Sequence, residues 1–134
     1  MTKDIDIERI ATRVIGCAIE VHRVLGPGLL ESVYRECLLI ELAENSLPAQ
    51  SERRFPVRYK KKTTRSTLTV DILVEESVVV ELKAIERIHP VHLAQVITYL
   101  KLSGYPIGLL MNFNTTSLRS GLRRLDHPDR YRAR

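Results

Sequence analysis

The stretch Val70-Asp71-Ile72-Leu73-Val74, followed after three residues by Val78-Val79-Val80-Glu81-Leu82-Lys83, decides how this chain folds. Runs so rich in Val, Ile and Leu are typical of strands covered on both faces, and the short connection predicts a hairpin. In its register Asp71 lies directly across from Glu81, and the two-residue period of a strand puts Lys83 on the same face. We expect the opposite face to be wholly apolar, made of Val70, Ile72, Val74, Val78, Val80 and Leu82.

Two acids facing each other on a buried hairpin need a compensating partner. Directly opposed residues have Cβ atoms roughly 4.5–5.5 Å apart, a separation at which like charges destabilise a sheet. Asp71 and Glu81 therefore suggest an oxygen-ligand site for Mg²⁺ or Mn²⁺, which could neutralise a phosphate and activate a bound water. Lys83 would orient or deprotonate that water, or stabilise the developing charge. The alternative is structural: an ion pair of Lys83 with Asp71 or Glu81.

The remaining pattern predicts a single α/β domain over residues 1–134. Apolar residues recur with helical spacing in two N-terminal segments, and Pro90 fits the first position of a third helix. Helices are expected over 4–24, 29–44 and 91–103, and strands over 50–59, 67–74, 78–83 and 107–112, with a short edge strand near Leu122 and a basic tail that frays from about residue 126. The order ααβββαβ predicts a mixed β-sheet flanked by helices.

Composition narrows the class of protein. The chain has 134 residues, 28% of them charged and 44% hydrophobic, as in ordinary globular proteins. Cys17 and Cys37 lie in apolar stretches, so we expect buried free thiols in a reducing compartment rather than a disulfide or a cysteine zinc site. The first residues lack a signal-peptide profile, and no run approaches the ~18 apolar residues of a membrane span. These features predict a cytoplasmic protein without a membrane partner.

Basic residues are concentrated in the second part of the chain. Residues 1–49 carry a net charge of −3 and residues 50–134 a net charge of +8. Such a basic half suits a polyanion such as nucleic acid, although a merely solvated surface is the alternative. Few aromatic residues accompany the charges, so a stacking platform for single strands is not expected. The two clusters are Arg53, Arg54, Arg58, Lys60, Lys61, Lys62 and Arg65, and Arg119, Arg123, Arg124, Arg130, Arg132 and Arg134.

The hairpin residues also resemble a known pattern. Asp71, followed ten residues later by Glu81-Leu82-Lys83, resembles the bipartite signature of the PD-(D/E)XK nuclease superfamily. The segment Gly28-Leu29-Leu30-Glu31-Ser32-Val33-Tyr34 is similar to the signature of the GxxExxY family, which is usually placed in that superfamily. Further blocks in the same order are Val80 to Ala84, Ala94-Gln95 with Tyr99 to Lys101, and Gly108 to Phe113, so the resemblance runs from about Gly26 to Arg124.

This resemblance implies a restriction-endonuclease-like core and a set of site residues. Asp71 and Glu81 would be the metal ligands, helped by the backbone carbonyl of Leu82, and Lys83 would be the catalytic lysine. Glu31 matches an acid that such nucleases place on a helix beside the metal; its alternative is an i,i+4 salt bridge to Arg35. Gln95 and Tyr99 match a pair that faces the active site; their alternatives are a surface amide and a core aromatic.

The function implied is that of a Mg²⁺- or Mn²⁺-dependent nuclease hydrolysing phosphodiester bonds of DNA or RNA. A second reading is a non-catalytic module on the same fold that binds nucleic acid or protein, because a fold does not establish catalysis. A third is an ion-paired structural domain that binds no nucleic acid. A domain this small often needs a partner to enclose a duplex, so a homodimer is one possibility.

Overall fold

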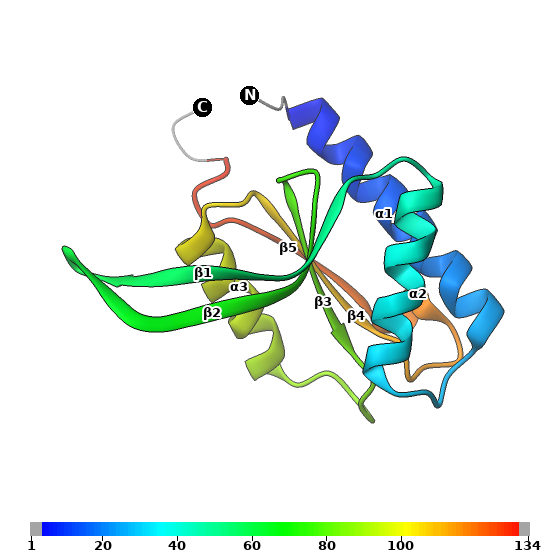
Figure 1. Cartoon of the computed structure of the whole chain (residues 1–134). Helices are drawn as coiled ribbons and strands as arrows, with labels where there is room; N and C mark the ends of the chain where they lie inside the picture. Colours follow the sequence, from blue (N-terminus) through cyan, green and yellow to red (C-terminus); the bar gives the residue numbers. More distant parts are fainter. Residues whose placement is uncertain (1–3, 132–134) are drawn as a thin grey trace.

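Three helices and a five-stranded sheet make up residues 4–131, the part of the chain that the computed structural model describes. The sheet order is β1-β2-β3-β4-β5, and only β3 and β4 are parallel (Figure 1). The predicted α/β class with a mixed sheet flanked by helices is therefore confirmed. The elements are α1 (Asp4–Leu25), α2 (Glu31–Glu44), β1 (Ala49–Tyr59), β2 (Lys62–Val74), β3 (Val78–Lys83), α3 (Pro90–Ser103), β4 (Ile107–Asn112), the 3₁₀ helix η1 (Leu118–Gly121) and β5 (Leu122–Asp126).

Helix α3 forms the crossover that lets β3 and β4 run parallel. It begins at Pro90, whose missing N–H is no loss in the first turn, and it ends at Gly104, which takes a left-handed φ of 86°. Asp4 and Asp6 lie in the first turn of α1, where the helix dipole favours negative charge. Within residues 4–131, none of the helices combines the length and apolar character needed to cross a membrane.

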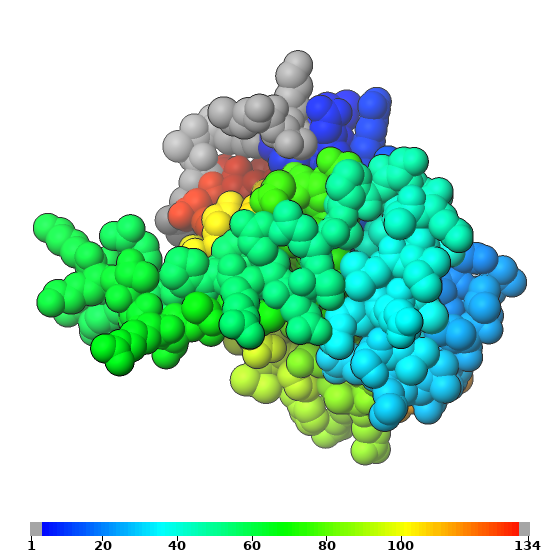
Figure 2. All heavy atoms as spheres, viewed as in Figure 1, coloured from blue at the N-terminus to red at the C-terminus, as the bar shows by residue number. Residues whose placement is uncertain are grey.

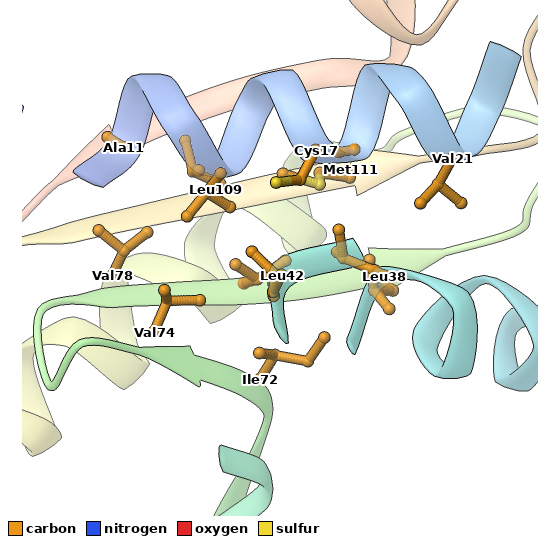
Figure 3. Close-up of a cluster of buried hydrophobic side chains, with 14 of the residues drawn as sticks. Ala11, Cys17, Val21, Leu38, Leu42, Ile72, Val74, Val78, Leu109 and Met111 are labelled. Atoms are coloured by element: carbon orange, nitrogen blue, oxygen red, sulfur yellow. The ribbon is translucent and has the colours of Figure 1, made fainter. Parts of the chain in front are cut away.

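The hydrophobic core is divided between the two faces of the sheet. One face is covered by α1 and α2, whose Cys17 and Leu42 point toward strand residues such as Val78 and Leu109 (Figure 3). The other face packs against α3, where Leu100 meets Leu73 and Val79. Cys17 is buried and Cys37 partly buried, and both are free thiols as expected. Covering both faces explains why β3 is apolar at every position except Glu81 and Lys83.

Strand β2 changes course at Asp71. Its pairing with β1 passes from Ser51↔Ile72 directly to Arg53↔Val70, and Glu52, between them, has a positive φ of 51°. The register is the same on both sides of this missing pair, and the left-handed backbone at Glu52 lies opposite the point where the side chains of β2 change face. As a result Val70 packs with Leu73 and Val79 against α3. The expectation that Val70 shares a face with Ile72 is therefore wrong, because regular alternation does not continue through Asp71.

The hairpin of β1 and β2 is longer than the sequence predicts. Strand β2 begins at Lys62 rather than at Thr67, and a turn between Tyr59 and Lys62 closes the hairpin. Polar residues carry this extension, so apolar content gave no sign of it. The hairpin projects beyond the rest of the sheet (Figure 1).

Candidate functional site

Asp71 and Glu81 meet where strands β2 and β3 separate. The pairs Val74↔Val78, Leu73↔Val79 and Ile72↔Val80 give the predicted hairpin register, and the next positions along it are Asp71 and Glu81. At this position the carboxylate side chains accept hydrogen bonds from backbone N–H groups, in place of backbone-to-backbone pairing. The Asp71 N–H donates to Glu81 Oε1 (3.1 Å), and the Leu82 N–H donates to Asp71 Oδ2 (2.8 Å). Each carboxylate is thus fixed by the main chain of the opposite strand.

The environment of Glu81 disfavours negative charge. Glu81 is only 5% exposed, and burial is the main reason why its pKa rises from 4.5 to about 8. The charges of Asp71 and Glu31 raise it further, whereas the hydrogen bond from Asp71 and the charge of Lys83 oppose the rise. Burial and the same Asp71 charge also raise the pKa of Glu31. Three acids therefore share one electrostatic environment that a cation would relieve.

Lys83 lies two residues after Glu81 and is partly buried. It pairs with Asn112 of β4, and its carbonyl accepts a hydrogen bond from the Phe113 N–H (2.9 Å). Among residues 4–131, its ammonium group forms no ion pair within 4.0 Å of a carboxylate. The structural alternative, an ion pair with Asp71 or Glu81, is therefore not formed in this structure.

Glu31 begins helix α2 and faces the same group of charges. The Arg35 guanidinium pairs with Glu52 (3.4 Å) instead, so the alternative of an i,i+4 salt bridge is not realised. The charges of Asp71 and Lys83 both act on the pKa of Glu31, which places its carboxyl in the neighbourhood of the hairpin acids. The structure thus brings Glu31 of helix α2 near Asp71 of β2 and near Glu81 and Lys83 of β3, three elements of which α2 is distant in sequence from the two strands.

Tyr34 holds the loop that precedes Glu31, a role that the sequence motif alone does not reveal. Its ring is fully buried and stacks on Phe113 at 4.6 Å between centroids. Its hydroxyl donates to the Gly26 carbonyl (2.6 Å) and accepts from the Leu29 N–H (3.1 Å). Gly28 has a left-handed φ of 97°, which glycine adopts without strain. In this motif Gly28 forms the turn, Glu31 supplies the acid, and the Tyr34 hydroxyl holds the turn in place.

Gln95 and Tyr99 lie one turn apart on α3, as expected from their spacing. The Gln95 Nε2 donates to the Tyr99 hydroxyl (3.2 Å). Burial raises the pKa of Tyr99, and the charges of Glu81 and Asp71 add to the rise, so the phenol lies near the hairpin acids. Tyr99 also packs at the border of the apolar cluster under α3. It is therefore a partly buried aromatic residue whose hydroxyl lies near the hairpin acids.

Asn112 is a second residue with a structural role near the site that the motifs did not indicate. It is buried at 2% exposure, and its side chain binds both the N–H (3.1 Å) and the carbonyl (3.0 Å) of Ile85. This contact fixes the chain directly after Lys83, because Lys83 and Asn112 are paired on neighbouring strands. A buried amide at the end of an otherwise apolar strand is the sequence signal that marks it.

The donor set suits a hard cation that keeps part of its water shell. Within the described range 4–131, no three His, Cys, Asp or Glu side chains are grouped closely enough to form a metal site alone. Mg²⁺ typically needs only one or two carboxylates, with waters and substrate phosphates completing its octahedron. Asp71 and Glu81 supply that number, and the apolar Leu82 has only its main chain to offer.

The two basic clusters have different surroundings. In the hairpin, Arg54, Arg58 and Lys62 are exposed. Near the C-terminus, Arg124 and Arg130 instead pair with acids, and the Arg130 side chain is only 4% exposed. Arg132 and Arg134 lie outside the described residues. In the second cluster, Arg124 and Arg130 are therefore already paired with acids of the same protein.

Comparison with known families agrees with this arrangement. The sequence model of the PD-(D/E)XK nuclease superfamily matches residues 8–125, which include all the site residues above. The comparisons with curated proteins and with solved structures found no match. The narrower resemblance to the GxxExxY family stays a prediction. Because the match covers most of the chain, this protein belongs to the PD-(D/E)XK nuclease superfamily.

Proposed function

We propose that the chain is a metal-dependent nuclease that hydrolyses phosphodiester bonds at the Asp71–Glu81–Lys83 site. The observation that carries the proposal is Glu81, a buried carboxyl held beside a second acid with no cation paired to it among residues 4–131. Natural proteins keep such destabilising arrangements mainly where function uses them. Membership of a nuclease superfamily supports the same reading.

Asp71 and Glu81 would hold Mg²⁺ or Mn²⁺, with the Leu82 carbonyl as a further donor. When bound, the metal would supply Lewis-acid stabilisation of the phosphate and a more acidic water. The protein prepares its two ligands in advance, because the hydrogen bonds from Leu82 and Asp71 N–H groups fix both carboxyls. Little reorganisation would then be needed on binding.

The other residues would act on the water and the phosphate. Lys83, free of an ion pair with either acid, would donate to the attacking water or to a phosphate oxygen and stabilise the charge that develops there. Glu31 would accept a hydrogen bond from a water at the site. The hydroxyl of Tyr99, bonded to Gln95, would orient a second water or a phosphate oxygen.

The test joins metal binding to cleavage. Calorimetric titration with Mg²⁺ and with Mn²⁺ at low salt is run on the wild type, on Asp71→Ala and on Glu36→Ala, a matched control on an exposed acid of α2. Plasmid nicking is measured on the same samples. We expect binding and nicking in the wild type and the control, and neither in Asp71→Ala. A wild type that binds no metal at about millimolar concentration, far above a functional Kd, contradicts the proposal.

Homodimer formation and a cytoplasmic location remain predictions from the sequence. Their tests are sedimentation of the full chain and fractionation of cells that express it.

A further inference from the structure

The outer part of the β1–β2 hairpin forms a basic arm, which we define as residues Arg54–Thr69. Figure 2 shows it standing clear of the rest of the molecule. The sequence contains no acidic residue between Arg53 and Val70. Lys60 lies over the Tyr59 ring at 5.4 Å, and the other cations of the arm form no ion pair or side-chain hydrogen bond with any residue from 4 to 131. Those cations are Arg54, Arg58, Lys61, Lys62 and Arg65, all of them exposed.

The root of the arm is fixed to the body of the protein. Arg53 pairs with Glu76 (3.2 Å) and lies over the Phe55 ring at 5.1 Å. Phe55 in turn meets Tyr105 edge to face at 5.5 Å, and the Tyr105 hydroxyl donates to Glu76 (2.7 Å). These contacts tie both the strand and its basic residue to the turn before β3 and to the end of α3. The direction of the arm is therefore set by packed side chains at its root.

The root also adjoins the candidate site. The pairing of β1 with β2 is interrupted at Glu52 and Asp71, and the arm, which ends at Thr69, stops two residues before the site aspartate on β2. From Ser51 to the turn at Lys60 the chain spans on the order of 30 Å at about 3.3 Å per residue. One turn of B-form DNA is about 34–36 Å long. A polyanion held at Asp71 thus has the cations of the arm within its next helical turn.

We propose that the arm binds duplex DNA by lying in the major groove, about one helical turn from the phosphate at the Asp71 site. The inference rests on the proposed function, since it names the substrate of that site. A two-stranded ribbon fits the ~12 Å major groove of B-DNA, whereas the deep, narrow major groove of duplex RNA does not admit it. Within the arm, Tyr59 is the only exposed aromatic residue, too little for a single-strand stacking platform.

The arm's remaining side chains suit such a groove. Hydroxyl groups, which bond either phosphates or base edges, are interspersed with the cations along β2, although the Thr64 hydroxyl already donates to backbone carbonyls of the hairpin. Exposed large apolar residues, which would favour a membrane or an apolar protein partner, are limited to Tyr59 within the arm. The hydroxyl-bearing residues are Thr63, Thr64, Ser66, Thr67 and Thr69.

Binding in the presence of a chelator tests the arm separately from catalysis. The probes are labelled DNA duplexes of about 20 base pairs, two helical turns, together with the matching single strand and duplex RNA. Fluorescence anisotropy is followed across a salt series for the wild type and for K61Q/K62Q. We expect the double variant to weaken duplex-DNA binding by roughly tenfold or more. The slope of log affinity against log salt should fall by about 1.8, which corresponds to two lost phosphate contacts.

Matched variants make the result decisive. R9Q/R119Q removes two exposed arginines outside the arm, on α1 and η1, and should bind duplex DNA like the wild type. K61R/K62R keeps the charges and should also bind normally. Equal losses in K61Q/K62Q and R9Q/R119Q, or an arm effect as large on single strands or duplex RNA, would overturn the inference. Because no cleavage is measured, a protein that fails the nicking assay can still pass this test, and the reverse also holds.

Discussion

Two groups of acids in this protein have opposite surroundings, and their carboxyl groups respond in opposite ways. Glu81 lies beside Asp71 and near Glu31, without a paired cation among residues 4–131, and its pKa rises to about 8 mainly through burial. Glu8 lies against Arg124 (2.6 Å) and Arg130 (2.9 Å), and hydrogen bonds from Arg124 above all lower its pKa to about 2. The same chemical group is thus strained in one place and satisfied in the other.

The difference separates structural charge from charge kept for another purpose. The Glu8 group closes the C-terminal segment onto α1, since Arg124 and Arg130 also bind Asp126. The Glu81 group joins no two segments through ion pairs within residues 4–131, and a like-charged buried pair lowers stability. Under the proposed function, a bound metal would compensate the hairpin acids and account for their position in the core.

The largest expected effect is on cleavage. Glu81→Gln keeps the size of the side chain and an oxygen that can accept from the Asp71 N–H, but it removes the charge that a metal needs. We expect plasmid nicking with Mg²⁺ to fall by at least ~100-fold, the scale seen when one catalytic group is lost. Glu8→Gln, at the other acid group, should nick at the wild-type rate. Equal nicking rates in the wild type, Glu81→Gln and Glu8→Gln would contradict a catalytic role for the Glu81 group.

The next effect is on folding stability at the satisfied group. Arg130→Met removes the guanidinium of a side chain that is only 4% exposed and leaves three acids with less compensation. Breaking a buried ion pair from one side destabilises by about 3–5 kcal/mol, and the partial exposure of the acids reduces this to an expected ~2–3 kcal/mol. Urea unfolding measures the change. Arg119→Met, an exposed residue, is the control and should stay within about 0.5 kcal/mol of the wild type.

Retention of full stability in Arg130→Met would show that the C-terminal arginines are no more engaged than those of the arm. The contrast between the two basic clusters would then fail together with the contrast between the two acid groups.

The third effect is a pH dependence of opposite sign in the two groups. The folded protein holds the Glu81 proton up to about pH 8, whereas the unfolded chain releases it near 4.5, so this group loses stability as the pH rises from about 5 to 8. For Glu8 the folded pKa is lowered to about 2, so its stability is present above 4.5 and is lost as the pH falls toward 2.

Metal-free unfolding curves between pH 3 and 8 measure both slopes. Glu81→Gln should remove the decline toward pH 8 and raise the free energy of unfolding there by about 1–2 kcal/mol, since one pKa unit corresponds to about 1.4 kcal/mol and coupling to Asp71 reduces the full shift. Glu8→Gln should flatten only the acid side, by less than about 1 kcal/mol, because its side chain is 41% exposed. Stability of Glu81→Gln at or below that of the wild type at pH 8 would contradict the assignment of strain to Glu81.

The order of elements and the hairpin register followed from the sequence because both depend on local signals. Apolar spacing marked the helices, Pro90 marked the start of α3, and the connection between Val74 and Val78 fixed Asp71 beside Glu81. The positions of these features in the chain were enough. No contact with a distant residue was needed to find them.

The parts that escaped prediction depend on tertiary contacts. Val70 was placed on the wrong face because the break at Asp71 involves Glu52 of another strand. Tyr34 and Asn112 act through Phe113, Gly26 and Ile85, which are distant or irregular partners that periodicity does not reveal. Likewise the sequence counted all arginines alike, while the structure separates Arg58, exposed in the arm, from Arg130, held between acids.

The smallest expected effect concerns Glu31, and it tests whether the strained group extends to helix α2. The charge of Glu31 is the weakest of the influences that raise the pKa of Glu81. Glu31→Gln should therefore lower the Glu81 midpoint by less than about one unit, whereas Asp71→Asn should lower it more. Carbon-detected NMR of the Glu81 carboxyl follows each titration directly, and Glu36→Gln, on an exposed turn of the same helix, should leave the midpoint unchanged. If Glu31→Gln behaves like Glu36→Gln, Glu31 is not electrostatically part of the site. The strained group would then consist of the two hairpin acids alone, facing a lysine that pairs with neither.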